Sequence, residues 1–142
     1  MANNKTLDNL FQLVHALKRQ LHEQIEQLDL GVTPMHVRVI KIINKMTPCT
    51  AIDIATMLER DKAQITRLVN TLIEKEFITK IANPTDKRSS YLCVTERGVK
   101  IVAKLAVIDN AMEEKITKHI SSDEIAVFQQ LADKMTDNLR HK

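Results

Sequence analysis

The sequence predicts a mainly α-helical fold with one small antiparallel β-hairpin. Only two glycines and three prolines occur among 142 residues, so few positions interrupt a helix. Two short β-rich runs, 77–81 and 91–94, flank a polar linker and have the length of paired strands. A hydrophobic content of 44% is enough for one core of ordinary size. We therefore expect a single domain over residues 1–142.

The first expected helix carries a long apolar stripe. Its apolar side chains advance in steps of three and four with one irregular place, the spacing of a seam that packs against another helix. They are Leu7, Leu10, Val14, Leu17, Leu21 and Leu28. Gly31 is expected to end this helix, and Thr33 and Pro34 start the next with a capping hydroxyl and a first-turn proline. The buried stripe of the second helix is Val37, Ile40 and Ile43.

Two further helices are expected on either side of a three-residue turn. Pro48 ends the second helix, and Thr50 can cap a short third one. The fourth helix follows Asp61, which heads a capping signature over 61–64. Only residues 59–61 separate the two, which is the spacing of a helix-turn-helix. The side chains assigned to the core are Ile52, Ile54, Ala55 and Leu58 on the third helix and Ile65, Leu68, Val69 and Leu72 on the fourth.

The polar side of the fourth helix and the hairpin after it indicate a nucleic-acid interface. The helix leaves five polar side chains toward solvent, namely Lys62, Gln64, Arg67, Asn70 and Thr71. The hairpin has a polar tip over 83–90 that contains two adjacent basic residues. A helix can enter the major groove of DNA while an adjoining hairpin places a cation beside the minor groove. This order favours a winged helix-turn-helix over 33–98 that binds double-stranded DNA.

Two long amphipathic helices are expected after the hairpin. Thr95 caps the first, which reaches about Ile120, and a capping box over 121–124 starts the second. Their apolar stripes are Val99, Val102, Leu105, Ala106, Met112 and Ile116, then Ile125, Phe128, Leu131, Ala132, Met135 and Leu139. Segments 1–30 and 100–142 carry more apolar surface than a small winged domain can cover. We expect them to be dimerisation helices of a two-fold homodimer.

Composition limits the partners and the compartment. The formal net charge of +3 permits a polyanionic partner without requiring one. Cys49 and Cys93 form no CxxC pair, and no run of about 18 apolar residues occurs, so we expect a cytoplasmic protein without a membrane partner. Histidines with metal-ligand spacing, a nucleophile elbow, a phosphate loop and an HExxH motif are all absent. We therefore expect no metal, no cofactor and no enzyme activity.

The wing and its exit resemble a known family. Asp86-Lys87-Arg88 is followed by Leu92-Cys93-Val94-Thr95-Glu96-Arg97-Gly98. This is similar to the pattern Asp-x-Arg, then Leu/Val-x-Leu-Thr-x-x-Gly, of the multiple antibiotic resistance regulator (MarR) family of winged helix-turn-helix transcription factors. Residues 66–69 and 72–75 also resemble that family's recognition helix. Glu76 departs from the pattern because the family usually has glycine there, and glutamate would strain a left-handed helix end.

The resemblance implies a homodimeric transcriptional regulator. Its recognition helices would enter successive major grooves, and its wings would reach the flanking minor grooves. The operator should then be an inverted repeat with centres roughly 10 bp apart. Repression is the family's commoner mode. Members usually respond to a small anionic aromatic effector, or to oxidation, at the junction between the dimerisation helices and the DNA-binding lobe.

Roles on the recognition helix follow from side-chain geometry. Arg67 can pair with guanine O6 and N7, and Gln64 can read adenine N6 and N7. A phosphate contact or an internal ion pair remains open for Arg67. Lys62 lies in the first turn of the helix, where a phosphate is favoured. Thr66 could contact either a base or a phosphate.

Roles in the wing follow from charge. Arg88 suits a narrow A·T-rich minor groove, and Lys87 beside it adds affinity independent of sequence. Asp86 would be repelled by phosphate, so it either orients Arg88, forms the turn after Pro84, or does both.

Residues for control are less distinct. His15, His36 and Arg38 could line an effector pocket, although a surface or core-edge position is the more ordinary interpretation of a histidine. Cys49 precedes a helix N-terminus that would stabilise a thiolate, so it could be a redox switch, although an inert thiol is the favoured alternative.

The alternative function is a winged-helix module that binds protein, or binds DNA nonspecifically, without effector control. None of the chain's four aromatic residues falls on the polar face, which favours nucleic acid over protein.

Overall fold

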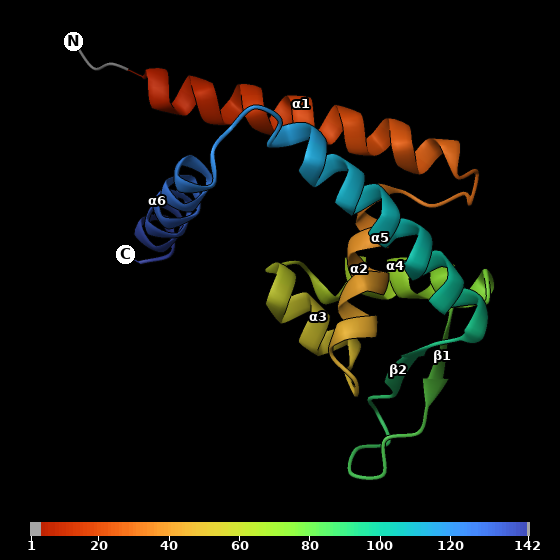
Figure 1. Ribbon diagram of the computed structural model, residues 1–142. Helices are drawn as coiled ribbons and strands as arrows, with labels where there is room; N and C mark the ends of the chain where they lie inside the picture. Colours follow the sequence, from red (N-terminus) through yellow and green to blue (C-terminus); the bar gives the residue numbers. More distant parts are fainter. Residues whose placement is uncertain (1–3, 142) are drawn as a thin grey trace. The chain divides into compact units, whose positions relative to one another are not determined.

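The computed structural model describes residues 4–141 as helices joined to a two-stranded antiparallel sheet (Figure 1), which confirms the predicted fold class. The helices are α1 (Lys5–Gln27), α2 (Pro34–Lys45), α3 (Ala51–Leu58), α4 (Lys62–Glu74), α5 (Glu96–Ile116) and α6 (Ser122–Arg140), and the strands are β1 (Ile78–Ile81) and β2 (Tyr91–Val94). The chain divides into two compact units, Met1–Val107 and Ile108–Lys142, and α5 continues from the first into the second. The expectation of a single domain stays a prediction.

The core of the first unit joins α2, α3 and α4 to the sheet and to the start of α5. On each helix the buried side chains recur mostly every three or four positions, so one side is apolar and the other is free for solvent. They include Val37, Ile40 and Ile43 on α2 and Ile65, Val69 and Leu72 on α4. The stripe predicted for α2 is confirmed, and Leu68 is half-buried at the edge of the same core.

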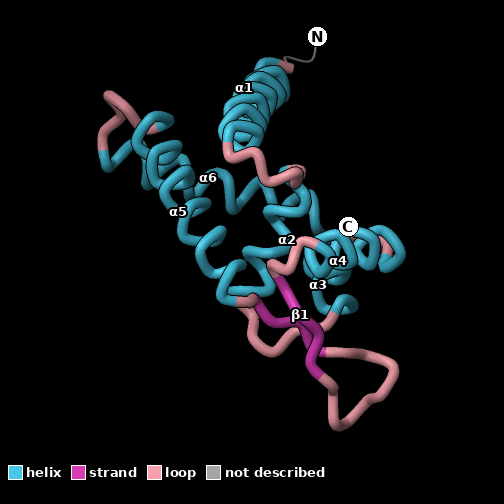
Figure 2. Tube along the Cα trace, turned by 90° about the vertical axis from the view of Figure 1, so that its right-hand side faces the viewer, coloured by secondary structure: helices cyan, strands magenta, loops and turns pink. Residues whose placement is uncertain are grey.

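The hairpin forms the predicted wing. In its antiparallel register Ile78 lies opposite Val94 and Ile81 lies opposite Tyr91. Figure 2 shows the two strands in magenta and the long loop that joins them. The backbone N–H of Leu92 also donates to the carbonyl oxygen of Cys49 at 2.8 Å. This bridge fixes the base of the wing to the segment between α2 and α3.

Most of the predicted helix caps are confirmed. The hydroxyls of Thr33, Thr50 and Ser121 each accept a hydrogen bond from a backbone N–H in the first turn of the following helix. A side chain in each first turn accepts in return from the N–H of the capping residue, which makes three capping boxes. Asp61 stands at the N-cap of α4, but its carboxylate makes no capping hydrogen bond. The capping role predicted for that side chain is therefore wrong.

Three helices of the first unit end in left-handed residues other than glycine. Helix α1 ends at Gln27. Asp29, with φ of 51°, is the first left-handed residue after it and precedes Gly31. The prediction that Gly31 ends the helix is thus wrong by several residues. Glu59 and Glu76 follow α3 and α4 with φ of 53° and 64°. The left-handed conformation that glycine would favour at position 76 is therefore kept by a glutamate.

Helix α5 is rotated from the predicted orientation. Val99 is 53% exposed, whereas Ile101 and Leu105 are buried. The rotation follows from Gly98, where an added Cβ would lie 2.0 Å from the carbonyl oxygen of Phe77, so the helix backbone packs directly on that residue. The helix also ends at Ile116, short of Ile120.

The predicted core position of Ile52 on α3 is wrong, because this side chain is exposed. It lies in the first turn of that helix, and Ile54 and Ala55 are the buried residues of α3.

Long apolar faces remain uncovered on α1 and α6. Ile25 is the buried residue of α1, and no residue of Ser122–Arg140 is buried. Phe11 is 64% exposed and Phe128 is 51% exposed. Such faces on long helices are typical of surfaces that pack against another chain.

Candidate nucleic-acid interface

The outward side of α4 carries the candidate recognition residues. Lys62, Thr66, Arg67 and Asn70 are exposed, and Gln64 and Thr71 are half-buried. The opposite side of the helix is held in the core by Ile65, Val69 and Leu72, so the outward side is fixed rather than free to rotate. Helix α3 precedes α4 across the three-residue turn 59–61, as predicted.

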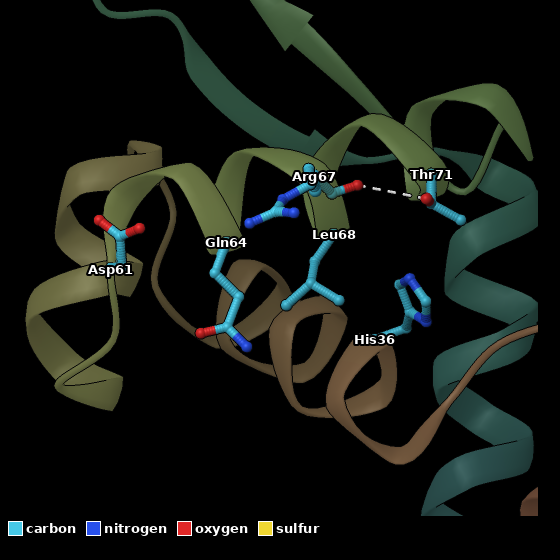
Figure 3. A pocket seen from close by; sticks show the side chains of 6 residues that line it. All are labelled: His36, Asp61, Gln64, Arg67, Leu68 and Thr71. Atoms are coloured by element: carbon cyan, nitrogen blue, oxygen red, sulfur yellow. Dashed lines mark hydrogen bonds between the residues drawn. The ribbon is translucent and has the colours of Figure 1, made fainter.

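The candidates divide between two flanks of α4. On one flank Gln64, Arg67 and Thr71 border a hollow of about 400 Å³ together with His36 of α2. Figure 3 shows Gln64 pointing from α4 toward α2 and the Arg67 side chain lying along α4, with Asp61 at the start of the helix. On the other flank Lys62, Thr66 and Asn70 border a groove of about 260 Å³ that is shared with the hairpin. We call this second space the wing-side groove.

The wing-side groove brings in residues that the sequence prediction missed. Lys80 of β1 and Ser89 and Ser90 of the wing loop line it beside Arg88. Lys80 lies directly opposite Leu92 in the sheet, so the two side chains share one face. Lys80 lies two residues after the buried Ile78, so the sequence indicates that both are on the same face of the strand. The strand register was needed to show that this face borders the groove.

The wing tip is shaped by two side-chain turns. The Asn83 side chain accepts from the backbone N–H of Thr85 at 3.1 Å, and Asp86 accepts from the backbone N–H of Arg88 at 2.9 Å. Asp86 therefore acts as a turn former, one of the two roles predicted for it. Asp86, Lys87 and Arg88 are all exposed.

Two threonine hydroxyls on α4 are already engaged. The Thr66 hydroxyl donates to the carbonyl oxygen of Lys62 at 2.9 Å, and the Thr71 hydroxyl donates to that of Arg67 at 3.2 Å. The second bond is drawn in Figure 3. A phosphate oxygen can only accept, so either hydroxyl must first turn away from the helix to contact one.

Of the three residues predicted for an effector pocket, His36 lines the hollow beside α4 and the other two do not. His36 lines the hollow beside Arg67, and its Nδ1 accepts from the backbone N–H of Thr33 at 2.9 Å. Burial first, and the charge of Lys75 second, lower the pKa of His36. His15 and Arg38 are exposed on α1 and α2 and line neither the hollow nor the wing-side groove.

Cys49 does not have the thiolate character expected from its place before α3. Its side chain is 0% exposed. Burial raises its pKa to about 11, with smaller contributions from Asp53 and Cys93. At neutral pH the group is a thiol, and thiols react with oxidants far more slowly than thiolates. The stabilised thiolate at this position is therefore a wrong prediction.

Among residues 4–141, no group of three or more His, Cys, Asp or Glu side chains gathers in a way that could hold a metal ion. Within the same range, no helix has the length and apolar character needed to span a membrane.

Comparison with known proteins bears on the family. Residues 32–90, which hold the helix-turn-helix and most of the wing, match the family model named "MarR family". The multiple antibiotic resistance protein MarR of Escherichia coli K12 is 26% identical over 131 residues, 91% of this chain and 90% of that protein. The chain carries the MarR family domain over residues 32–90.

Further similar proteins and structures agree with this match. The HTH-type transcriptional regulator BilQ of Clostridioides difficile is 35% identical over 82 residues. That match spans 58% of this chain and 55% of BilQ. Among solved structures, a MarR protein from Peptoclostridium difficile aligns with a TM-score of 0.85 at 21% identity, over 98% of this chain and 89% of its own. The S. aureus MepR–DNA complex aligns at 0.81 with 23% identity, over 92% and 96%. At such identities the structural matches establish the fold.

Proposed function

We propose that this protein is a transcriptional regulator that binds operator DNA in a sequence-specific way. The observation that carries the proposal is the fixed orientation of α4. Its core side is buried while Lys62, Arg67 and Asn70 face solvent, and the cationic wing tip follows in the same unit. A helix presented in this way fits the major groove, and a short cationic hairpin fits the adjoining minor groove. A fold match to the MepR–DNA complex supports this use of the fold.

The roles of individual residues are part of the proposal. Arg67 and Gln64 read bases, with Asn70, Thr66 and Thr71 beside them, while Lys62 and Lys87 contact phosphates. Arg88 enters or borders the minor groove, and Asp86 holds its backbone in place. This assignment gives the chain no catalytic role, and it places the protein with the chromosome in the cytoplasm.

A homodimer is the second part of the proposal. The uncovered apolar faces of α1 and α6 supply the surface, and a two-fold dimer would place two α4 helices on an inverted repeat. Light scattering at micromolar concentration should give twice the mass of the 16.2 kDa chain. Phe11→Asp should lower that mass, because it puts a charge on the apolar face of α1. A stable monomer in the unmodified protein would remove this part.

Selection from randomised duplex DNA at near-physiological salt tests the central claim. We expect recovery of an inverted repeat with half-sites roughly 10 bp apart. On that site Arg67→Ala should lower the preference over a scrambled duplex, whereas Lys87→Ala should weaken both duplexes alike. Lys118→Ala, an exposed change just after α5, is the matched control and should alter neither.

Two results would count against sequence-specific regulation. If Arg67→Ala weakened the cognate and scrambled duplexes equally, its base-reading role would be wrong. Recovery of no motif, with binding that disappears as salt rises, would indicate a nonspecific DNA-binding module.

Release by a small anionic aromatic effector, and repression as the mode of action, complete the proposal. The nearest structural support is the hollow in which His36 lies beside Arg67 on the recognition helix. Salicylate titrated against the preformed protein–DNA complex should release the duplex if an anion of this class acts there. Unchanged anisotropy up to millimolar ligand would contradict an effector of this kind.

A further inference from the structure

The wing-side groove has an unbalanced set of charges. Lys62 of α4, Lys80 of β1 and Arg88 of the wing loop line it, and every other lining residue is neutral. The hollow on the opposite flank of α4 differs, because there Arg67 shares the lining with the carboxylate of Asp61. Three cations around one groove without a counter-charge create a positive potential that attracts an anion.

Ion pairs within the described residues do not balance the charges of these three side chains. Across the part of the chain that the structure describes, 4–141, none of the three side chains forms an ion pair with a carboxylate. In their hydrogen bonds, Lys62 accepts through its backbone carbonyl and Arg88 donates through its backbone N–H. Their charged ends are therefore available for a ligand.

The sheet register places Lys80 on the side of the groove. Lys80 lies opposite Leu92, and the two side chains share one face of the hairpin. Leu92 is buried and also lines the groove, so this face is the one directed toward the helices. Lys80 itself is exposed, which leaves its ammonium group at the mouth.

The position of the groove points to one kind of anion. In duplex DNA the phosphate backbone separates the major groove from the minor groove, and phosphate contacts fix the register of a bound protein. A protein with α4 in the major groove and its wing at the adjoining minor groove must straddle that backbone. The wing-side groove lies between these two elements. Its volume of about 260 Å³ is below the usual range for drug-sized ligands, roughly 300–1,000 Å³.

We propose that the wing-side groove seats one backbone phosphate of the bound duplex, and that Lys80 is a positioning residue for it together with Lys62 and Arg88. The inference rests on the proposed DNA-binding function and adds a third contact element, strand β1, to the helix and the wing tip. Lys80 sets the distance between the helix and the wing on the duplex and does not itself read a base.

Neutral phosphate replacements provide the test. A series of cognate duplexes, each with a single methylphosphonate, is titrated with the unmodified protein and with Lys80→Ala. On unmodified DNA, Lys80→Ala should bind roughly five- to tenfold more weakly, as expected for one charge-assisted contact at an exposed site. Its plot of log K against log salt should be shallower by about 0.9. Lys80→Arg should restore both values, and Lys118→Ala should change neither.

The decisive result is non-additivity at one position. One methylphosphonate should weaken the unmodified protein by at least as much as Lys80→Ala does, and should cost Lys80→Ala clearly less than it costs the unmodified protein. If Lys80→Ala bound with unchanged affinity and salt dependence, or if its effect added to that of every methylphosphonate, the phosphate seat would be wrong while DNA binding stood. Failure of the unmodified protein to bind any duplex would overturn the proposed function and this inference with it. Matching thermal unfolding curves would show that both Lys80 variants are folded.

Discussion

The hydroxyl of Thr95 donates a 2.6 Å hydrogen bond to the carbonyl oxygen of Glu76. The same hydroxyl accepts from the backbone N–H of Gly98 at 3.0 Å, so Thr95 caps α5 and ties its start to the end of α4. The backbone N–H of Thr95 donates to the carbonyl of Phe77, also at 3.0 Å. Thr95 thus links the start of the first strand and the end of the second to the adjoining helices.

Removal of the Thr95 hydroxyl should destabilise this junction. Thr95→Val keeps the shape of the side chain but loses both hydrogen bonds, and we expect about 1–2 kcal/mol less free energy of unfolding. Urea denaturation followed by circular dichroism measures the change. Thr95→Ser is the control, because it keeps the hydroxyl and should lose much less. Equal losses in the two variants would show that the methyl group, not the hydroxyl, matters.

Glycine at position 76 should stabilise the protein. Glu76 has a φ of 64°, which costs an L-residue roughly 1 kcal/mol relative to glycine. Its ion pair with Arg97 spans 3.9 Å between exposed groups and offsets little of this. Glu76→Gly should therefore raise the free energy of unfolding by about 1 kcal/mol. Lys75→Gly, one residue earlier at a right-handed φ of −80°, should instead lower it.

Alanine at position 98 should have the opposite effect from most glycine replacements in helices. Changing a glycine within a helix to alanine ordinarily raises the free energy of unfolding by about 1 kcal/mol. Here the new Cβ would lie 2.0 Å from the carbonyl oxygen of Phe77, a backbone atom that also accepts from Thr95. We expect Gly98→Ala to lower stability by about 2 kcal/mol or more. A melting temperature equal to that of the unmodified protein would show that the helix can shift without cost.

The features that the sequence predicted correctly are local. A capping hydroxyl acts on a backbone N–H three residues away, so Thr33, Thr50 and Ser121 could be assigned without knowledge of the fold. The three-residue turn and the hairpin were likewise evident from spacing and composition. Asp61 shows the limit of this approach, because a carboxylate at an N-cap position can still point elsewhere.

The features that the sequence did not predict depend on contacts between distant segments. The rotation of α5 is set by the approach of Gly98 to Phe77, so the choice between Val99 and Ile101 could not be made from periodicity alone. The place of Lys80 in the wing-side groove required the strand register. Glu59 and Glu76 adopt left-handed turns because the adjoining elements fix the chain on both sides, which overrides their own preference.

The buried thiol of Cys49 should make stability fall at high pH. Its pKa is raised from 9.0 to about 11 in the folded protein, so the folded state holds the proton more tightly than the unfolded state. The resulting stabilisation is complete below pH 9 and is lost as pH rises toward about 11. The free energy of unfolding should therefore decline more steeply over this range in the unmodified protein than in Cys49→Ala. Rapid alkylation of native Cys49 at neutral pH would contradict the assignment.

His36 should make stability fall at mildly acidic pH. Its Nδ1 accepts a hydrogen bond from the N–H of Thr33 and can do so only when the ring is neutral at that nitrogen. Burial and then the charge of Lys75 lower its pKa below 6.5, so the unfolded state binds the proton more readily than the folded state. The stabilisation is present above pH 6.5 and is lost as pH falls through the lowered pKa.

His36→Gln isolates this contribution. Glutamine is a usual partner in a capping box, so it can keep the acceptor at the start of α2 without titrating. Thermal unfolding between about pH 8 and pH 5 should show a smaller loss of stability in His36→Gln than in the unmodified protein. His15→Gln, a change at an exposed histidine of α1, should follow the unmodified curve. Because His36 also borders the hollow beside Arg67, its protonation would add positive charge next to the recognition helix. If the His36→Gln and unmodified curves ran parallel across this range, His36 would not be the titrating group.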